Sequence, residues 1–183
     1  MSFVKSCFIA LVLLMLVACD DLKDNFNPSS DDLRPVVDAG SDGSSVSQAA
    51  PDFTIPDTLG NLTTMSTELS GADGIVLYFT MWCPICDSHM SHMRVNIIPN
   101  YPTVKFYFVD YVSGSISVSR SAQISNGYTG SDYIVLVDTV QIALDLYKGT
   151  MGTTIVIDRN GIVSMNEDYK DGVRLNTALS ELP

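Results

Sequence analysis

The sequence predicts an α/β fold in which helices flank a central mixed β-sheet. Two observations lead to this prediction. Between about residues 74 and 147, strand-like apolar runs alternate with helix-like segments, which indicates parallel strands joined by helices. Residues 153–157 and 162–165 then flank an Asp-Arg-Asn-Gly turn at 158–161, which indicates an antiparallel hairpin. The sheet should therefore contain strands of both directions.

Four further segments predict strands. Gly74–Thr80 (GIVLYFT) is a continuous apolar and β-rich run, as expected for a strand that is buried on both faces. Residues 103–112 (TVKFYFVDYV) and 133–137 (YIVLV) have a similar composition. A shorter strand is expected at 61–65, after a turn.

Helices are predicted from caps and breakers. One should begin near Cys83 and continue until Pro99 ends it. Asp138 can cap a second helix, whose buried side is predicted to carry Val140, Ala143, Leu144 and Tyr147. The polar stretch 113–127 is compatible with a helix or with irregular structure, and an amphipathic pattern predicts a closing helix near the C-terminus.

The composition favours one compact domain with additional segments. Apolar residues make up 46% of the 183 positions, and 21 acidic residues stand against 10 basic ones. The formal charge of −11 argues against a nucleic-acid partner, because phosphate binding needs Lys and Arg. It also argues against docking on anionic lipid by charge.

The N-terminus has the features of an export signal. Lys5 supplies positive charge, and residues 8–17 form an unbroken apolar run that is too short to span a bilayer as a helix. The run ends in Leu-Val-Ala-Cys at 16–19, which resembles the bacterial lipobox. This resemblance implies a lipoprotein signal peptide at 1–18, lipid on Cys19, and a location in the bacterial cell envelope outside the cytoplasmic membrane. The alternative is an ordinary signal peptide in which Cys19 stands by accident.

Residues 19–50 are predicted to be a disordered acidic tether. They are rich in Asp, Ser, Gly and Asn and have no sustained apolar period, so they cannot bury enough surface to offset the entropy of ordering. The folded domain is expected at 51–183. The tether would hold this domain away from the membrane.

The four cysteines reduce to one redox pair. Cys7 lies in the predicted signal and Cys19 would carry lipid, which leaves Cys83 and Cys86 in C-x-x-C spacing. A disulfide between them would close a tiny loop and would stabilise the fold weakly. A redox centre therefore explains the pair better than the alternative, a structural disulfide.

The position of the pair predicts a role for each sulfur. A strand ends at Thr80 and a helix begins near Cys83, so the helix N-terminus offers unpaired N–H groups and partial positive charge to a thiolate. Cys83, at the exposed end, should be the attacking sulfur with the lower pKa. Cys86, one turn further and more buried, should resolve the mixed disulfide. Pro84 suits the first helical turn, where no N–H is needed.

Residues 78–86 (YFTMWCPIC) resemble the active-site segment of thioredoxin-like proteins, above all the exported, membrane-tethered thiol–disulfide oxidoreductases of the TlpA and ResA type. Residues 50–53 (APDF) resemble the opening motif that this group shares with the peroxiredoxins, and residues 156–161 resemble its penultimate hairpin. The resemblance implies a thioredoxin-like fold, with Trp82 as a supporting residue. It also implies disulfide exchange with exported protein thiols, a membrane redox donor or acceptor, and no cofactor besides the redox-active cysteine pair.

Two positions depart from the family pattern. Gly152 stands where the family usually has a proline, directly before Thr153 and Thr154. Thr153 is predicted to be a supporting residue. In the family that proline shapes the loop facing the disulfide and blocks metal capture by the thiols. The usual acidic proton acceptor after the second cysteine is replaced by His89, which can titrate near neutral pH. His89 is predicted to accept a proton; the alternative is a half-exposed helix residue without a role.

A copper-binding protein is the second functional hypothesis. Cys86, His89 and Met90 share one helix face by their spacing, and together with Cys83 they form a set of soft donors that suits Cu(I). The alternative for Met90 is core packing. A thiol peroxidase is the third hypothesis, because Thr80 and Cys83 match the T-x-x-C core of the peroxiredoxin site, although the proline of that site is missing.

Overall fold

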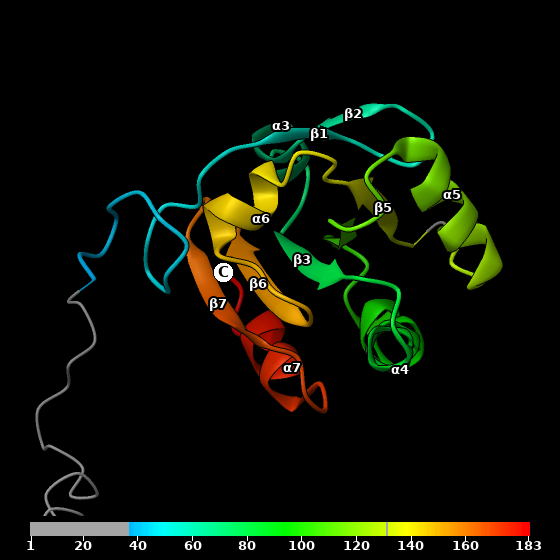
Figure 1. Ribbon diagram of the computed structural model, residues 1–183. Coiled ribbons are helices and arrows are strands. Elements are labelled where there is room, and N and C mark those ends of the chain that lie inside the picture. The colour runs from blue at the N-terminus through cyan, green and yellow to red at the C-terminus, as the bar shows by residue number, and fades with distance from the viewer. Residues whose placement is uncertain (1–36, 131) are drawn as a thin grey trace, which may run out of the picture. The chain divides into compact units, whose positions relative to one another are not determined.

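The computed structural model describes residues 37–130 and 132–183 (Figure 1). The predicted signal peptide, Cys19 and the tether up to residue 36 lie outside the described residues. The strands are β1 (Thr54–Pro56), β2 (Leu62–Thr64), β3 (Gly74–Thr80), β4 (Val104–Asp110), β5 (Ile134–Val137), β6 (Thr153–Asp158) and β7 (Val163–Asp168). The helices are α3 (Met65–Leu69), α4 (Pro84–His92), α5 (Ile116–Ser125), α6 (Ile142–Tyr147) and α7 (Val173–Ser180).

A five-stranded sheet in the order β5-β4-β3-β6-β7 forms the centre. β3 and β5 each run parallel to β4, whereas β6 is antiparallel to both β3 and β7. The predicted α/β class with a mixed sheet is confirmed. β3 has the predicted bounds, and all of its residues are buried, as its continuous apolar run indicated.

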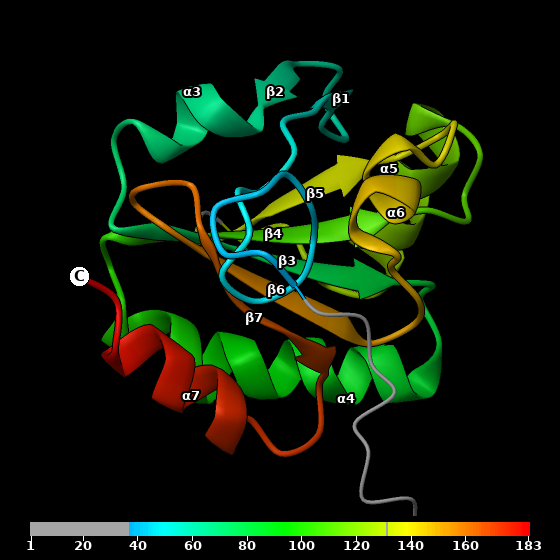
Figure 2. The ribbon, with the colours of Figure 1, turned by 90° about the vertical axis from the view of Figure 1, so that its left-hand side faces the viewer.

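Helices cover both faces of the sheet. Figure 2 shows α4 and α7 on one face and α3 and α6 on the other. Because side chains alternate along a strand, Val76 and Tyr78 enter one core, which also contains residues of α4 and α7, while Leu77 and Phe79 enter the second core. Among the residues that the structure describes, no helix is long and apolar enough to cross a membrane.

The helix after the cysteine pair is less regular than predicted. α4 ends at His92, a π-helical turn follows at Met93–Ile97, and a 3-10 turn closes the segment at Ile98–Asn100. The wide π turn allows both Met93 and Ile97 to enter the core. Pro99 lies within the last turn, where its missing N–H does not interrupt an α-helical hydrogen bond.

Asp138 caps α6 as predicted, but the helix begins later than expected. The buried Asp138 carboxylate accepts the N–H groups of Ile142 (2.8 Å) and Leu144 (2.9 Å). Val140 lies in the turn that the carboxylate spans and is 71% exposed, so its predicted place on the buried side is wrong. The polar stretch 113–127 contains helix α5.

Residues 37–50, which we name the N-terminal strap, belong to the folded part of the chain. This corrects the predicted domain boundary at residue 50. The Ser47 N–H donates to the carbonyl of Val163 (2.8 Å), and the Val163 N–H donates to the carbonyl of Gln48 (2.9 Å). Composition was misleading here, because backbone hydrogen bonds to the outer strand β7 need no apolar side chains.

The opposite edge of the sheet is covered as well. The Thr58 N–H donates to the carbonyl of Val135 in β5 (3.1 Å), and Asp57 forms an antiparallel bridge with Leu136. The Thr58 hydroxyl also donates to the side chain of Gln123 in α5 (2.6 Å). Both outer strands thus pair, over part of their length, with backbone that precedes β3.

Candidate functional site: a dithiol at the start of α4

The two cysteines lie at the junction of β3 and α4. Cys83 is the N-cap residue of α4, and its sulfur accepts the N–H of Cys86 at 3.3 Å. Pro84 occupies the first turn, as predicted. The two sulfur atoms lie 3.0 Å apart as free thiols. The helix N-terminus therefore presents a dithiol where positive partial charge favours a thiolate.

Burial distinguishes the two sulfurs. Cys83 is half-buried, whereas Cys86 has no exposed surface. An incoming sulfur can therefore reach Cys83 but not Cys86, in agreement with the predicted difference in exposure. Met81 and Ile85 are exposed next to these residues in the chain, and Sδ of the exposed Met151 lies 3.4 Å from the Cys83 sulfur, so apolar side chains flank Cys83.

The surroundings of Cys86 favour its thiolate. Burial raises the pKa of this thiol, but hydrogen bonds from the Met81 backbone, the Cys83 side chain and backbone, and the Thr80 side chain outweigh burial and lower the pKa of Cys86 below its ordinary value. The sequence predicted the lower pKa at Cys83 from the helix position alone. The donors around Cys86 allow negative charge to be shared across the sulfur pair.

Trp82 forms the turn that leads into the dithiol. Its backbone is left-handed, with φ at +56°, a conformation that costs a non-glycine residue about 1–2 kcal/mol. The indole Nε1–H donates to the Asp110 carboxylate at 2.6 Å, and the Trp82 backbone N–H donates to the Thr80 hydroxyl at 3.2 Å. These two bonds hold the strained residue in place.

The sequence did not single out Asp110. This buried residue ends β4 directly opposite Thr80, which ends β3. Besides the indole, its carboxylate accepts the N–H groups of Val112 (3.1 Å) and Ser113 (3.0 Å). The available signal was an acidic residue at the carboxyl end of a predicted strand parallel to the active-site strand. Asp110 is a positioning residue, because it acts on the dithiol through Trp82.

His89 has a specific partner inside the domain. Its Nδ1 lies 3.0 Å from the Tyr78 hydroxyl, and Tyr78 belongs to the same buried core cluster as Cys86. Burial, together with negative charge on Cys86, raises the pKa of Tyr78 well above its ordinary value. The Tyr78 hydroxyl therefore remains protonated, and it can donate its proton only while its oxygen accepts a second proton. Sequence analysis treated Tyr78 as a strand residue and missed this connection.

Tyr169 packs against this histidine. The ring centroids of Tyr169 and His89 are 4.8 Å apart, and the Tyr169 hydroxyl bonds Nδ1 of His92 at 2.6 Å. Burial lowers the pKa of His89, and charge on His92 lowers it further. Burial, with the charge of Asp171, raises the pKa of Tyr169 to about 12. At neutral pH the site therefore holds an uncharged imidazole beside a protonated phenol.

The loop before β6 is built around Gly152. Its φ is +89°, its N–H donates to the carbonyl of Phe79 (3.0 Å), and its carbonyl accepts the N–H of Tyr169 (2.8 Å). Proline has no N–H and a negative φ, so this loop has a backbone different from that of a proline loop. Thr153 is buried, and its hydroxyl donates to Asp168 (3.1 Å), so its support of the site comes through the loop.

Met151 is the loop residue that reaches the dithiol. Its Sδ lies 3.4 Å from the Cys83 sulfur. Sequence analysis missed this residue, because no spacing rule relates it to a cysteine 68 positions earlier. The available signal was its place directly before Gly152, in the loop that the family resemblance placed opposite the disulfide.

The donor set predicted for copper is assembled only in part. The two cysteines are adjacent, but Nδ1 of His89 bonds the Tyr78 hydroxyl. Met90 is fully buried in the core cluster that includes Cys86, which agrees with the packing alternative. Within residues 37–130 and 132–183, no three His, Cys, Asp or Glu side chains come together to hold a metal ion.

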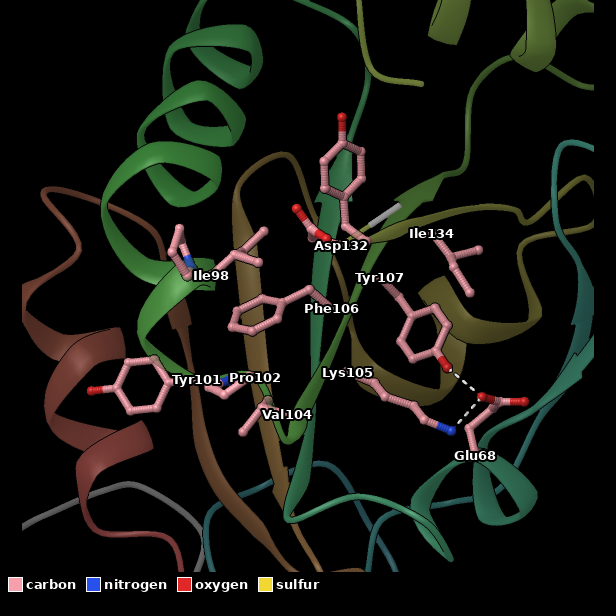
Figure 3. Close-up of a pocket in the computed structure, with 12 residues that line it drawn as sticks. Glu68, Ile98, Tyr101, Pro102, Val104, Lys105, Phe106, Tyr107, Asp132 and Ile134 are labelled. Carbon is pink, nitrogen blue, oxygen red and sulfur yellow. Dashed lines mark hydrogen bonds and ion pairs between the residues drawn. The ribbon is translucent and has the colours of Figure 1, made fainter. Parts of the chain in front are cut away.

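A cavity of about 560 Å³ lies along β4 and the start of β5 (Figure 3). Glu68 accepts hydrogen bonds there from Nζ of Lys105 and from the Tyr107 hydroxyl, both at 2.8 Å. The bond from Lys105 lowers the pKa of Glu68. None of the lining residues belongs to the dithiol site, and both polar partners of the carboxylate come from the protein itself. The cavity therefore adds nothing to the redox centre.

Solved structures share this fold. A candidate protein disulfide isomerase from Bacteroides thetaiotaomicron has a TM-score of 0.62 and 22% identity, covering 80% of this chain and 91% of its own. A candidate thiol:disulfide interchange protein DsbE from Chlorobium tepidum gives 0.57 and 21%, covering 72% and 93%. Peroxidoxin BcpB from Mycobacterium tuberculosis gives 0.58 and 21%, covering 75% and 95%. A search of curated proteins found no match.

These similarities establish the thioredoxin-like fold that the active-site segment predicted. A thioredoxin-like fold with a half-exposed and a buried thiol at a helix N-terminus defines the class, a thioredoxin-like oxidoreductase. More particularly, the chain belongs to the AhpC/TSA family, whose family model matches residues 46–165. That range spans well over half of the chain and includes the dithiol and the Gly152 loop. The redoxin resemblance of residues 78–86 is confirmed at the level of the family.

Proposed function

We propose that the protein is a membrane-anchored thiol–disulfide oxidoreductase outside the cytoplasmic membrane, which exchanges disulfides with exported protein thiols through Cys83 and Cys86. One observation supports this proposal most strongly: a half-exposed sulfur and a fully buried one lie 3.0 Å apart at the start of α4. Such a pair can form and break a disulfide with a small movement. Only one of its sulfurs is accessible to a macromolecular substrate.

The reaction proceeds in two exchanges. The Cys83 thiolate attacks one sulfur of a substrate disulfide, a mixed disulfide forms, and the other substrate sulfur leaves as a thiolate. The Cys86 thiolate then attacks the Cys83 sulfur, which forms the intramolecular disulfide and releases the second substrate thiolate. Two electrons pass from the dithiol to the substrate, and the reverse sequence oxidises substrate thiols. A membrane redox donor or acceptor would restore the starting state.

Tyr78 and His89 provide the proton path for the second exchange. Cys86 is buried, so its proton needs an internal acceptor before the sulfur can attack. As this proton passes to the Tyr78 oxygen, the hydroxyl proton passes to Nδ1 of His89 across 3.0 Å. The lowered pKa of His89 keeps the ring neutral and ready to accept it. The sequence-based role of His89 as a proton acceptor is thus carried out through a tyrosine.

A trapping experiment tests the roles of the two sulfurs. Cys86→Ser should accumulate mixed disulfides with exported proteins, because the intermediate cannot be resolved, whereas Cys83→Ser should trap few. In the reduced protein, an alkylating agent should modify Cys83 before Cys86, since only Cys83 is accessible. Equal trapping by both variants, or faster alkylation of Cys86, would show that the roles are assigned wrongly.

The membrane anchor needs a separate test. The lipobox-like sequence at 16–19 supports lipid on Cys19, and these residues lie outside the described part of the chain. Cys19→Ser should leave the protein soluble or unprocessed when cells are fractionated. Cys7→Ser, in the same N-terminal segment, serves as the control and should remain in the membrane fraction. A processed Cys19→Ser protein that still fractionates with membranes would contradict lipid attachment.

Hydrogen peroxide is the competing oxidant that the T-x-x-C match suggested. The Thr80 hydroxyl accepts the N–H of Trp82 at 3.2 Å, and the buried Thr80 side chain helps to lower the pKa of Cys86. It therefore serves the resolving thiol, whereas a peroxide would meet Cys83. This geometry favours thiol exchange. If the rate of turnover with hydrogen peroxide as sole oxidant equals the rate of protein disulfide reduction, the peroxidase hypothesis is favoured instead.

A further inference from the structure

Three sulfur atoms from two separate segments meet at one point. The Cys83 sulfur is 3.0 Å from that of Cys86 and 3.4 Å from Sδ of Met151. The cysteines come from the start of α4, and the methionine comes from the loop before β6. We propose that the reduced protein binds one Cu(I) ion between the two cysteine thiolates and the Met151 thioether.

The chemistry of the donors favours Cu(I). Thiolate and thioether sulfurs are soft ligands, which select a soft monovalent ion over hard cations. Zinc also binds thiolates, but a structural zinc site needs four strong ligands. Across residues 37–130 and 132–183, no group of three His, Cys, Asp or Glu side chains supplies them, and Nδ1 of His89 is already bonded to Tyr78. A site of three sulfur ligands, with no further charged ligand, suits an ion of low coordination number such as Cu(I).

The loop presents the methionine in a defined way. Gly152, directly after Met151, is buried and is held by hydrogen bonds to Phe79 (3.0 Å) and Tyr169 (2.8 Å). Its backbone therefore fixes the direction in which Met151 leaves the loop, as a preorganised ligand requires. Met151 itself is 36% exposed and Cys83 is half-buried, so an ion or a second metal-binding protein can reach the sulfurs from solvent.

The surface around the site disfavours hydrated ions. Met81 (41% exposed) and Ile85 (54% exposed) lie beside the dithiol in the chain, and Cys86 beneath it is fully buried. A hard cation would lose its water here without gaining oxygen ligands. Cu(I) gains sulfur ligands instead, so the apolar rim adds selectivity to the donor set.

Binding leaves the oxidation state of copper unchanged. One Cu(I) ion replaces the protons of the two thiols, and both protons are released to solvent. When a substrate disulfide accepts two electrons from the pair, the thiolates become the Cys83–Cys86 disulfide and the ion retains only the thioether. Copper binding and disulfide exchange are therefore mutually exclusive. The site itself depends on the reduced thiols and not on the proposed exchange activity.

Competition with a chromophoric Cu(I) chelator tests the site. The reduced full-length protein, kept free of oxygen, should bind one Cu(I) per chain. Met151→Leu should lower the affinity by about tenfold or more, since even outer-sphere partners of metal ligands contribute about 10–100-fold. Leu59→Ala, at an exposed apolar position (68% exposed) between β1 and β2, is the control and should leave the affinity unchanged. X-ray absorption should find three sulfur neighbours in the wild type and two in Met151→Leu.

Other outcomes would overturn the proposal. Failure to bind one Cu(I) per chain, or equal affinity in the wild type and Met151→Leu, excludes the three-sulfur site. Loss of copper in His89→Gln, with Met151→Leu unaffected, would assign the third ligand to the histidine. Reduction of a protein disulfide by the copper-free wild type is measured separately, so failure of the copper site and failure of the exchange activity are distinguishable.

Discussion

Replacing Asp110 by Asn should loosen the Trp82 turn without creating a cavity. The amide has nearly the shape of the carboxylate, but only one of its two heavy atoms accepts hydrogen bonds. Asp110 uses one oxygen for the indole and the other for the N–H groups of Val112 and Ser113. In either orientation of the introduced side chain, therefore, the amide nitrogen would face a donor. At least one charge-assisted bond is lost.

The structure sets the size of the effect. Asp110 is 1% exposed, and a hydrogen bond to a charged group contributes about 1.5–3 kcal/mol. Asp110→Asn should therefore lower the free energy of unfolding by roughly 2–4 kcal/mol once the facing donors are included. The amide oxygen keeps two bonds if it faces Val112 and Ser113, so the bond that Asp110→Asn loses is the one to the indole, and Trp82→Phe removes the same bond. The combined variant should consequently lose about 1.5–3 kcal/mol less than the sum of the two single variants.

Urea unfolding of the reduced protein and its variants measures this coupling. Asp145→Asn, at an exposed position in α6, is the control and should change the free energy of unfolding by less than about 0.5 kcal/mol. Disulfide reduction by the Asp110 and Trp82 variants should also be slower, because the turn before Cys83 is no longer fixed. A coupling below about 0.5 kcal/mol would refute the role assigned to the indole–carboxylate bond.

Two further outcomes test the surroundings of the dithiol. Resolution of the mixed disulfide should slow as the pH falls through the pKa of His89, which lies below the ordinary 6.5, because the protonated ring accepts no proton. Rapid-mixing kinetics measure this pH dependence. The same dependence in His89→Gln or Tyr78→Phe would exclude the proton path through these two residues. Gly152→Ala should cost about 1–2 kcal/mol for its positive φ, since its Cβ would meet only Nδ1 of His89, at 4.0 Å, an ordinary contact. Gly152→Pro should cost about 3 kcal/mol or more, because the N–H bond to Phe79 is lost. Equal losses in thermal unfolding would contradict this loop geometry.

The central sheet was predictable because its signals are local. Gly74–Thr80 is apolar at nearly every position, and such a run is stable only between two helical layers. The Asp-Arg-Asn-Gly turn likewise determines the β6–β7 hairpin within a few residues. The π turn at Met93–Ile97 was not predictable in this way, because it depends on which side chains the core accepts.

The cysteines were predictable, but their partners were not. The C-x-x-C spacing acts within one helical turn, so the proximity of Cys83 and Cys86 follows from the sequence. Asp110 and Met151 reach the site through sheet register and loop folding over long stretches of chain. Tyr78 belongs to a strand that was predicted correctly, yet its hydroxyl gains a role only through the placement of His89 on α4.

The N-terminal strap was misjudged for a different reason. Its composition indicates that it cannot form a core, and the structure does not give it one. Ser47 and Gln48 are ordered instead by backbone hydrogen bonds to the carbonyl and the N–H of Val163. Val163 belongs to β7, so these bonds depend on that strand. The composition of a segment predicts whether the segment can form a core by itself. The ordering of the N-terminal strap depends instead on a neighbouring strand.

The coverage of both sheet edges limits how the protein can bind a substrate polypeptide. Under the proposed function the protein would meet unfolded exported polypeptides, for which an open strand edge is a template for aggregation. Here residues 47–48 and 57–58 occupy positions on the outer strands, so a substrate polypeptide cannot extend the sheet there. Under the proposed function, a substrate would then bind through side chains near Cys83 and not by adding a strand to the sheet. It could be released after exchange without forming a continuous sheet with the protein.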